Sequence, residues 1–223
     1  MAVCMEQSFD SNPRPTVFQL PRQTGALAVA QACRESALHF VNEVASDENS
    51  HRSFLVWLSG SYSWLTSYAR EASTGRPSDD RFNVQAAYGG VESEMLRERI
   101  TDAREEVLSV LRSLTDEECA YQFAGAAIVD GLIIECHDGE GNRGWIPVAQ
   151  KNSTIVQRIL SLVAVDYLMQ GEEYEGSLCV CGRCDRVSFD SIDRARGSCR
   201  HHNSGIYARR IADTWPAAPR ETA

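Results

Sequence analysis

With 223 residues and 43% apolar content, the chain can bury one substantial hydrophobic core and a small appendage. Its formal net charge of −9 argues against a protein that coats nucleic acid with its whole surface. No apolar run approaches the roughly 20 residues that span a bilayer, so we expect no membrane association. The N-terminus has no charged and then apolar signal segment, which predicts a cytoplasmic protein in a reducing compartment.

The first part of the chain predicts a disordered lead followed by a helix. Residues 1–16 contain Ser, Asn and Pro without an apolar period, so we expect them to be disordered. An α-rich body is then expected over residues 17–176, beginning with a helix from about Gln23 to Ala45. The residues expected near one face of this helix are Leu27, Ala30, Leu38, Val41 and Val44.

The second predicted helix, from about His51 to Ala72, is rich in aromatic residues. Its apolar residues spread over most of the circumference, which indicates a central helix packed on several sides. Aromatic residues at helical spacing are more often core than ligand-binding. The alternative is an enzyme pocket in the helical body, lined by His51, Trp57, Tyr62 and Trp64. A Gly, Pro, Ser and Asp-rich loop is expected over residues 74–90.

The third predicted helix has the cleanest apolar period in the chain. Its stripe of Leu96, Ile100, Ala103, Val107, Val110 and Leu114 fits a bundle helix or a short coiled-coil seam, and we favour packing within the chain. Thr115 and Glu118 form a predicted capping box for a fourth helix through Ile128, which Asp130 and Gly131 end.

A β-hairpin and a last long helix are predicted next. The hairpin strands are expected at 132–134 and 145–148, with Pro147 on an edge or at a bulge. The helix is expected from Thr154 to about Met169, capped by Asn152 or Ser153, and Gly171 is expected to end it. Its predicted core residues are Ile155, Ile159, Leu162, Val163 and Val165.

Two short ligand pairs near the C-terminus predict a metal site. The motif Cys181-Gly-Arg-Cys184 is followed, after fourteen residues, by Cys199-Arg-His201-His202. Such pairs can close four donors around one tetrahedral Zn²⁺, leaving no position for water or substrate, so a single structural ion is expected. The favoured ligands are Cys181, Cys184, Cys199 and His202. Cys179 and His201 are alternative ligands.

These two pairs resemble zinc-ribbon or zinc-knuckle modules over about residues 179–202. The resemblance implies a small stable platform over residues 177–210 and leaves the function open. The stretch 187–189 suits a short strand beside the first ligand pair. A flexible tail is expected over residues 211–223. The predicted fold is therefore mainly α, a helical bundle with one β-hairpin plus a small C-terminal zinc-ribbon-like module.

The predicted zinc module is basic in an acidic chain. Between residues 179 and 210, seven arginines stand against three aspartates, a local charge of +4 before metal and thiolates are counted. A solvated rim explains this as well as a phosphate-binding surface does. The arginines that would contact nucleic acid are Arg194, Arg196, Arg200, Arg209 and Arg210.

The sequence leaves two classes of function open. No catalytic constellation is present, which favours a cytoplasmic regulatory or adaptor protein that binds a protein partner and carries structural zinc. Within this class, nucleic-acid binding through the arginine-rich module is the alternative. The second class is an enzyme with a pocket in the helical body and structural zinc. The sequence does not predict an oligomeric state.

Overall fold

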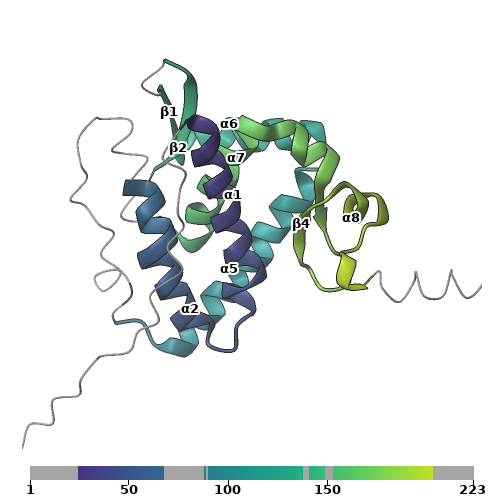
Figure 1. Cartoon of the computed structure of the whole chain (residues 1–223). Coiled ribbons are helices and arrows are strands. Elements are labelled where there is room, and N and C mark those ends of the chain that lie inside the picture. Colours follow the sequence, from purple (N-terminus) through teal and green to yellow (C-terminus); the bar gives the residue numbers. More distant parts are fainter. Residues whose placement is uncertain (1–24, 68–87, 89, 138–140, 149–152, 203–223) are drawn as a thin grey trace, which may run out of the picture.

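The structure, a computed structural model, describes residues 25–67, 88, 90–137, 141–148 and 153–202 (Figure 1). The described part is mostly helical with two antiparallel β-hairpins, so the predicted fold class is confirmed. The predicted lead at 1–16 and tail at 211–223, and nearly all of the loop at 74–90, lie outside these residues. The main helices are α1 (Ala26–Asn42), α2 (Ser50–Trp57), α5 (Ser93–Ser113), α6 (Glu117–Val129), α7 (Ile155–Ser177) and α8 (Ser191–Arg196).

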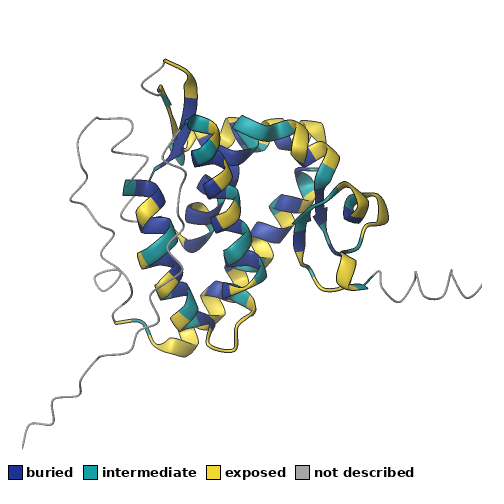
Figure 2. Cartoon of the chain, viewed as in Figure 1, coloured by how far each residue is buried: buried dark blue, intermediate teal, exposed yellow. Residues whose placement is uncertain are grey.

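Helix α7 lies at the centre of the fold. It contacts α1, α5, α6 and the strand β2 (Arg143–Pro147), which pairs antiparallel with β1 (Ile133–His137). Figure 2 shows buried residues on the faces of α1, α5 and α7 that turn toward one another. The predicted hairpin is confirmed, and Pro147 lies on an edge strand opposite Ile133. All five predicted core residues of α7 are buried.

The buried face of α1 and of the turn that follows it includes Ala30, Val41 and Val44 as predicted, and Leu38 is half-buried, but Leu27 is exposed. The apolar stripe runs through Ala30, Cys33, Ala37 and Phe40 to Val44, which begins a short 3-10 turn over Val44–Ser46. Extending this stripe backward by four residues reaches Ala26, so Leu27 lies about 100° away around the helix axis and is exposed.

At the start of α1, a β-carbon on Gly144 would stand 2.6 Å from that of Ala26. Glycine therefore permits the close approach of α1 to β2.

The aromatic helix buries one face, whereas Val56 and Trp64 are exposed in the described structure, so it is not the central helix packed on several sides that the sequence predicted. It is helical from Ser50 through Ser67 and contains one π-helical turn at Leu58–Tyr62. Phe54, Trp57 and Tyr62 are buried and join Phe40 of α1 in an aromatic cluster with ring centroids 5.3–6.2 Å apart. These side chains fill the core, which is the ordinary role of aromatic residues at helical spacing.

Helices α5 and α6 pack within the chain. The apolar stripe of α5 faces α7 and α2, which confirms packing within the chain. Of the predicted residues, Val110 is only half-buried, whereas Leu108 and Leu111, which were not predicted, are buried. The cap predicted at Thr115 is wrong, because its hydroxyl donates to the carbonyl of Arg112. Asp116 is the N-cap of α6 and accepts from the amide of Cys119.

The C-terminal end of α6 follows the prediction. Gly131 has a left-handed φ of 66° and donates its amide to the carbonyl of Ile128. The next amide, of Leu132, donates to the carbonyl of Ala127. These two bonds form a Schellman motif, which ends the helix and turns the chain into β1.

Helix α7 begins and ends differently from the prediction. Thr154 is its N-cap, not Asn152 or Ser153, and forms a complete capping box with Gln157. Gly171 does not end the helix. Instead, Gln170 leaves helical geometry (φ −141°, ψ 36°), and a second helical segment runs to Ser177. Burial of Tyr174 on the second segment provides contacts that local propensity does not reveal.

Buried polar contacts hold the two segments of α7 against α1. Asp166, before the kink, accepts from Nε of Arg34 at 2.7 Å and from the hydroxyl of Tyr174 at 2.6 Å. Arg34 also pairs with Glu173 on the second segment. Its guanidinium lies 4.2 Å from the ring centroid of Phe189. The kinked helix is therefore connected to α1 and to the C-terminal hairpin.

The C-terminal hairpin shares the core of the body. Its strands are β3 (Leu178–Val180) and β4 (Val187–Phe189), so the strand predicted at 187–189 is confirmed. Leu178 and Val187 belong to the same buried cluster as the aromatic residues of α1 and α2. The ends of α1 and α5 and the kinked part of α7 therefore position this hairpin.

Candidate metal centre

The first ligand pair lies in the turn that joins β3 to β4. Cys181 directly follows β3, and its amide donates to the carbonyl of Arg186 at 2.9 Å. The amide of Asp185 returns to the carbonyl of Cys181, also at 2.9 Å, with Asp185 in the left-handed region at φ 56°. Outside the turn, Arg112 of α5 pairs with Asp185 at 2.6 Å. These bonds form a tight knuckle that brings Cys181 and Cys184 to one side.

The second ligand pair follows α8. Asp190 caps this short helix by accepting from the amides of Ile192 and Asp193. Gly197, with φ 62°, ends it and redirects the chain to Cys199. A helical turn then begins, and the amide of His202 donates to the carbonyl of Cys199 at 3.0 Å. This turn places the imidazole beside the thiol of Cys199.

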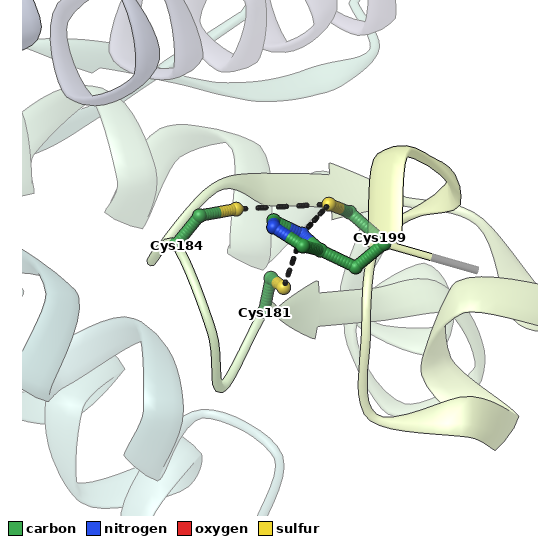
Figure 3. A group of neighbouring side chains, drawn as sticks. Cys181, Cys184 and Cys199 are labelled. Atoms are coloured by element: carbon green, nitrogen blue, oxygen red, sulfur yellow. Dashed lines mark hydrogen bonds between the residues drawn. The ribbon is translucent and has the colours of Figure 1, made fainter. Parts of the chain in front are cut away.

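The four predicted ligands converge on one point, and we call them the Cys/His centre. Their ligand atoms all lie within 4.8 Å of one another (Figure 3). The sulfurs of Cys184 and Cys199 are 3.7 Å apart, and Nδ1 of His202 lies 3.4 Å from Cys199 and 3.7 Å from Cys181. A tetrahedral zinc site has edges of about 3.8 Å between sulfurs and about 3.5 Å between sulfur and nitrogen. The centre could therefore hold a metal ion.

The environment of the centre favours thiolate at one of its cysteines. Burial would raise the pKa of the Cys181 thiol, but hydrogen bonds from the backbones of Cys199, Arg183 and Cys184 outweigh it and lower the pKa to about 6. Burial, together with bonds to Cys181 and Cys199, raises the pKa of Cys184 to about 11. Binding a cation would displace the proton from Cys184, since thiolates are the ligating form.

The alternative ligands lie outside the centre. Cys179 is on β3, and its buried thiol donates to the carbonyl of Asp193 at 3.3 Å. Burial raises the pKa of this thiol, which opposes ligation. His201 is not part of the group and lines a neighbouring cleft. The geometry thus brings together the favoured set and neither alternative.

The predicted nucleic-acid contacts are only partly described. Arg194 is half-buried on α8, whereas Arg196 and Arg200 are exposed. Arg200 lies 3.6 Å from the carboxylate of Asp190. Arg209 and Arg210 fall outside the described residues.

The residues of the alternative enzyme pocket differ in exposure. Trp57 is buried and donates to the backbone carbonyl of Ser36 at 3.0 Å. Tyr62 is buried beside it, while Trp64 is 39% exposed.

Three residues that support the centre carried no sequence signal. Asn42 bonds the backbone of Val187, Arg112 pairs with Asp185, and Arg104 lines the cleft beside Cys184. They lie on α1 and α5, far from the ligands in sequence, and have no characteristic spacing. The ribbon resemblance fits the first pair, on a hairpin turn, whereas the second pair lies on a helical turn.

Comparison with known proteins identifies no relative. No protein-family model matches the chain, and a search of curated proteins finds no significant match. Among the described residues, no helix combines the length and apolar character needed to cross a membrane.

Proposed function

We propose that the Cys/His centre holds one Zn²⁺ as a structural ion. Three cysteine sulfurs and one imidazole nitrogen are donors that zinc prefers. Three of their separations, 3.4–3.7 Å, fit tetrahedral geometry, and all four ligand atoms lie within 4.8 Å of one another. Four protein ligands complete the coordination, so the ion stabilises the fold and is not a catalyst. The convergence of these four donors is the observation that supports the proposal.

Metal analysis tests this proposal. Protein purified without added zinc should contain about one equivalent, and Cys184→Ser should lose most of it. Cys119→Ser is the matched control, because Cys119 is an exposed thiol on α6 outside the centre. Zinc absent from the parent protein, or equal zinc in both variants, would reject the assignment.

We further propose that the protein is a cytoplasmic regulatory or adaptor protein that binds another protein. The supporting feature is the outer face of α6, where Tyr121 is 80% and Val129 84% exposed. Ile128 is also exposed on this helix. We call these three residues the α6 face. Exposed apolar side chains grouped on one helix are typical of protein contacts.

The charges around the α6 face define the partner. Exposed Glu117 and Glu118 flank it at the start of α6, and exposed Asp130 flanks it at the end. A complementary partner is a basic segment with apolar anchors, because such a segment matches both the acidic ends and the apolar middle. Tyr121 is the expected anchor, since tyrosine combines large contact area with low conformational entropy.

A set of matched variants tests the partner proposal. Tyr121→Ser and Val129→Ser should each abolish co-purification of a protein that the parent retains in cell extract. Leu27→Ser is the control, because Leu27 is 55% exposed on α1 and lies outside the α6 face. Retention of the same protein by the α6 variants would reject this surface.

Nucleic-acid binding through the C-terminal module is the second candidate, supported by the exposure of Arg196 and Arg200. Each neutralised phosphate of duplex DNA adds about −0.9 to the slope of log affinity against log salt. Because the chain carries −9 overall, we expect duplex affinity no tighter than micromolar at physiological salt. A nanomolar, steeply salt-dependent complex that joint replacement of Arg194, Arg196 and Arg200 abolishes would favour this candidate.

A further inference from the structure

A cleft of about 300 Å³ lies between the helical body and the Cys/His centre. Its walls come from the end of α1 and the following 3-10 turn, from α5, and from the C-terminal module. This volume is at the lower end of those typical for small-ligand sites. The lining residues are Asn42, Ser46, Arg104, Cys184, Arg186 and His201.

Some hydrogen-bond donors of Ser46, Arg104 and Arg186 in this cleft have no protein acceptor among the described residues. Arg104 donates through Nε to the carbonyl of Val41 at 3.0 Å and through Nη1 to Glu105 at 3.4 Å, which leaves Nη2 unbonded. The guanidinium of Arg186 and the hydroxyl of Ser46 have no side-chain bond within the described part. Only 15% of the Arg104 side chain is exposed, so Nη2 is held in place.

Basic side chains line the cleft, although the chain as a whole is acidic. Two of the six lining residues are arginines, and none is Asp or Glu, although the whole chain has 31 acidic against 22 basic residues. Asn42 bonds the backbone of Val187 through both its amide nitrogen and its oxygen, which holds this residue of the wall in place. Guanidinium groups on two separate elements favour an oxyanion between them.

We propose that this cleft binds the phosphate group of a phosphate monoester. Ser46 of the 3-10 turn, Arg104 of α5 and Arg186 of the C-terminal knuckle offer donors from three separate elements that line the cleft. A monoester offers three terminal oxygens to such donors, whereas a carboxylate offers two in one plane. A diester has two terminal oxygens and carries a substituent on each side. The site goes beyond the proposed protein contact, because the α6 face contributes no residue to it.

Calorimetric titration of zinc-loaded full-length protein with methyl phosphate tests the proposal. Arg186→Gln should weaken binding about tenfold or more, because a hydrogen bond from a charged donor to phosphate is lost. Arg186 is exposed and has no side-chain partner among the described residues, so this variant should fold normally. Arg183→Gln is the matched control, since Arg183 is exposed on the same knuckle but does not line the cleft. Ser46→Ala should weaken binding by a smaller factor.

Two further probes define the chemistry and the source of the phosphate. Dimethyl phosphate and acetate should bind at least about tenfold more weakly than methyl phosphate. A phosphoserine peptide that binds about tenfold tighter than methyl phosphate would identify a phosphorylated protein as the source, and equal affinity would identify a small metabolite. Either result supports the site.

Three results would overturn the proposal. They are no binding of methyl phosphate up to about 10 mM, equal affinity in Arg186→Gln and Arg183→Gln, or equal affinity for methyl and dimethyl phosphate. Zinc content is measured on each sample, so failure of the phosphate site and failure of the zinc assignment are distinguishable.

Discussion

The side chain of Asn42 forms two hydrogen bonds with the backbone of Val187. Its amide nitrogen donates to the Val187 carbonyl at 2.9 Å, and its oxygen accepts from the Val187 amide at 2.8 Å. Asn42 is the last residue of α1, and Val187 begins β4. These two hydrogen bonds join the C-terminal hairpin to the end of α1. The knuckle that carries Cys181 and Cys184 is therefore held against the helical body.

Replacing Asn42 should weaken the whole fold. Asn42→Ala leaves the amide and carbonyl of Val187 without their partner, and we expect a loss of about 2 kcal/mol in the free energy of unfolding. Urea unfolding at fixed zinc concentration measures it. Gln122→Ala is the control, because Gln122 bonds only an exposed glutamate on α6, and its change should stay within about 0.5 kcal/mol. Equal stability of the two variants would contradict the docking role.

Cys179 should not contribute to metal binding. Its thiol donates to the carbonyl of Asp193 and lies outside the Cys/His centre. Cys179→Ala should therefore keep about one equivalent of metal while losing about 1 kcal/mol of stability to the small cavity. Metal analysis beside Cys181→Ala, which should lose the ion, distinguishes the roles. Loss of metal from Cys179→Ala would show that the ligand set is wrong.

The buried hydroxyl of Tyr174 should be important for the kink in α7. It donates to Asp166 at 2.6 Å, and Tyr174 is buried. Tyr174→Phe should cost about 1.5 kcal/mol, because a hydrogen bond to a charged acceptor is lost while Arg34 and Gln170 still bond Asp166. Tyr121→Phe, on the exposed α6 face, should be neutral in the same thermal or urea unfolding measurement. A neutral result at Tyr174 would count against this network.

Acid should remove the stabilisation that Asp116 gives to α6. Bonding from the Cys119 backbone lowers the pKa of Asp116 below its ordinary value of 3.8. A carboxyl whose pKa is lower in the folded protein than in the unfolded chain stabilises the fold at pH values above its unfolded-state pKa. This stabilisation is lost as the pH falls through the pKa of the folded state. The stability of Asp116→Asn should not contain this pH-dependent contribution, because asparagine can cap the helix but has no titrating carboxyl. Unfolding curves of both proteins between about pH 5 and pH 2 test this, and parallel pH profiles would refute it.

Two glycines near the end of α6 should respond oppositely to alanine. Gly125 is in the helix, and a β-carbon there meets nothing within 4 Å, so Gly125→Ala should stabilise by about 0.5–1 kcal/mol. Gly131 has φ 66°, so Gly131→Ala should destabilise by about 1–2 kcal/mol. Thermal unfolding of both variants checks the signs, and a neutral Gly131→Ala would show that the left-handed turn is dispensable.

Local signals in the sequence predicted the elements better than their ends or faces. The period of Leu96, Ile100 and Ala103 correctly identified α5 and its buried side. Side-chain caps are decided by competition between neighbouring groups, so Asp116 and Thr154 were missed in favour of adjacent residues. Leu27 was wrongly placed on the buried face of α1 because it is apolar, although Ala30, Val41 and Val44 were placed correctly.

The sequence by itself indicated the four donors that the structure brings together, since two pairs at an offset of three specify donors that short turns can bring together. It also determined the helical class, because apolar periods are written into consecutive residues. Only the tertiary structure decided where these parts meet. The contact of Asn42 with Val187, the continuation of α7 past Gln170, and the cleft between Arg104 and Arg186 join segments distant in the chain. Such contacts depend on the packing of the whole core, and no short stretch of residues encodes them.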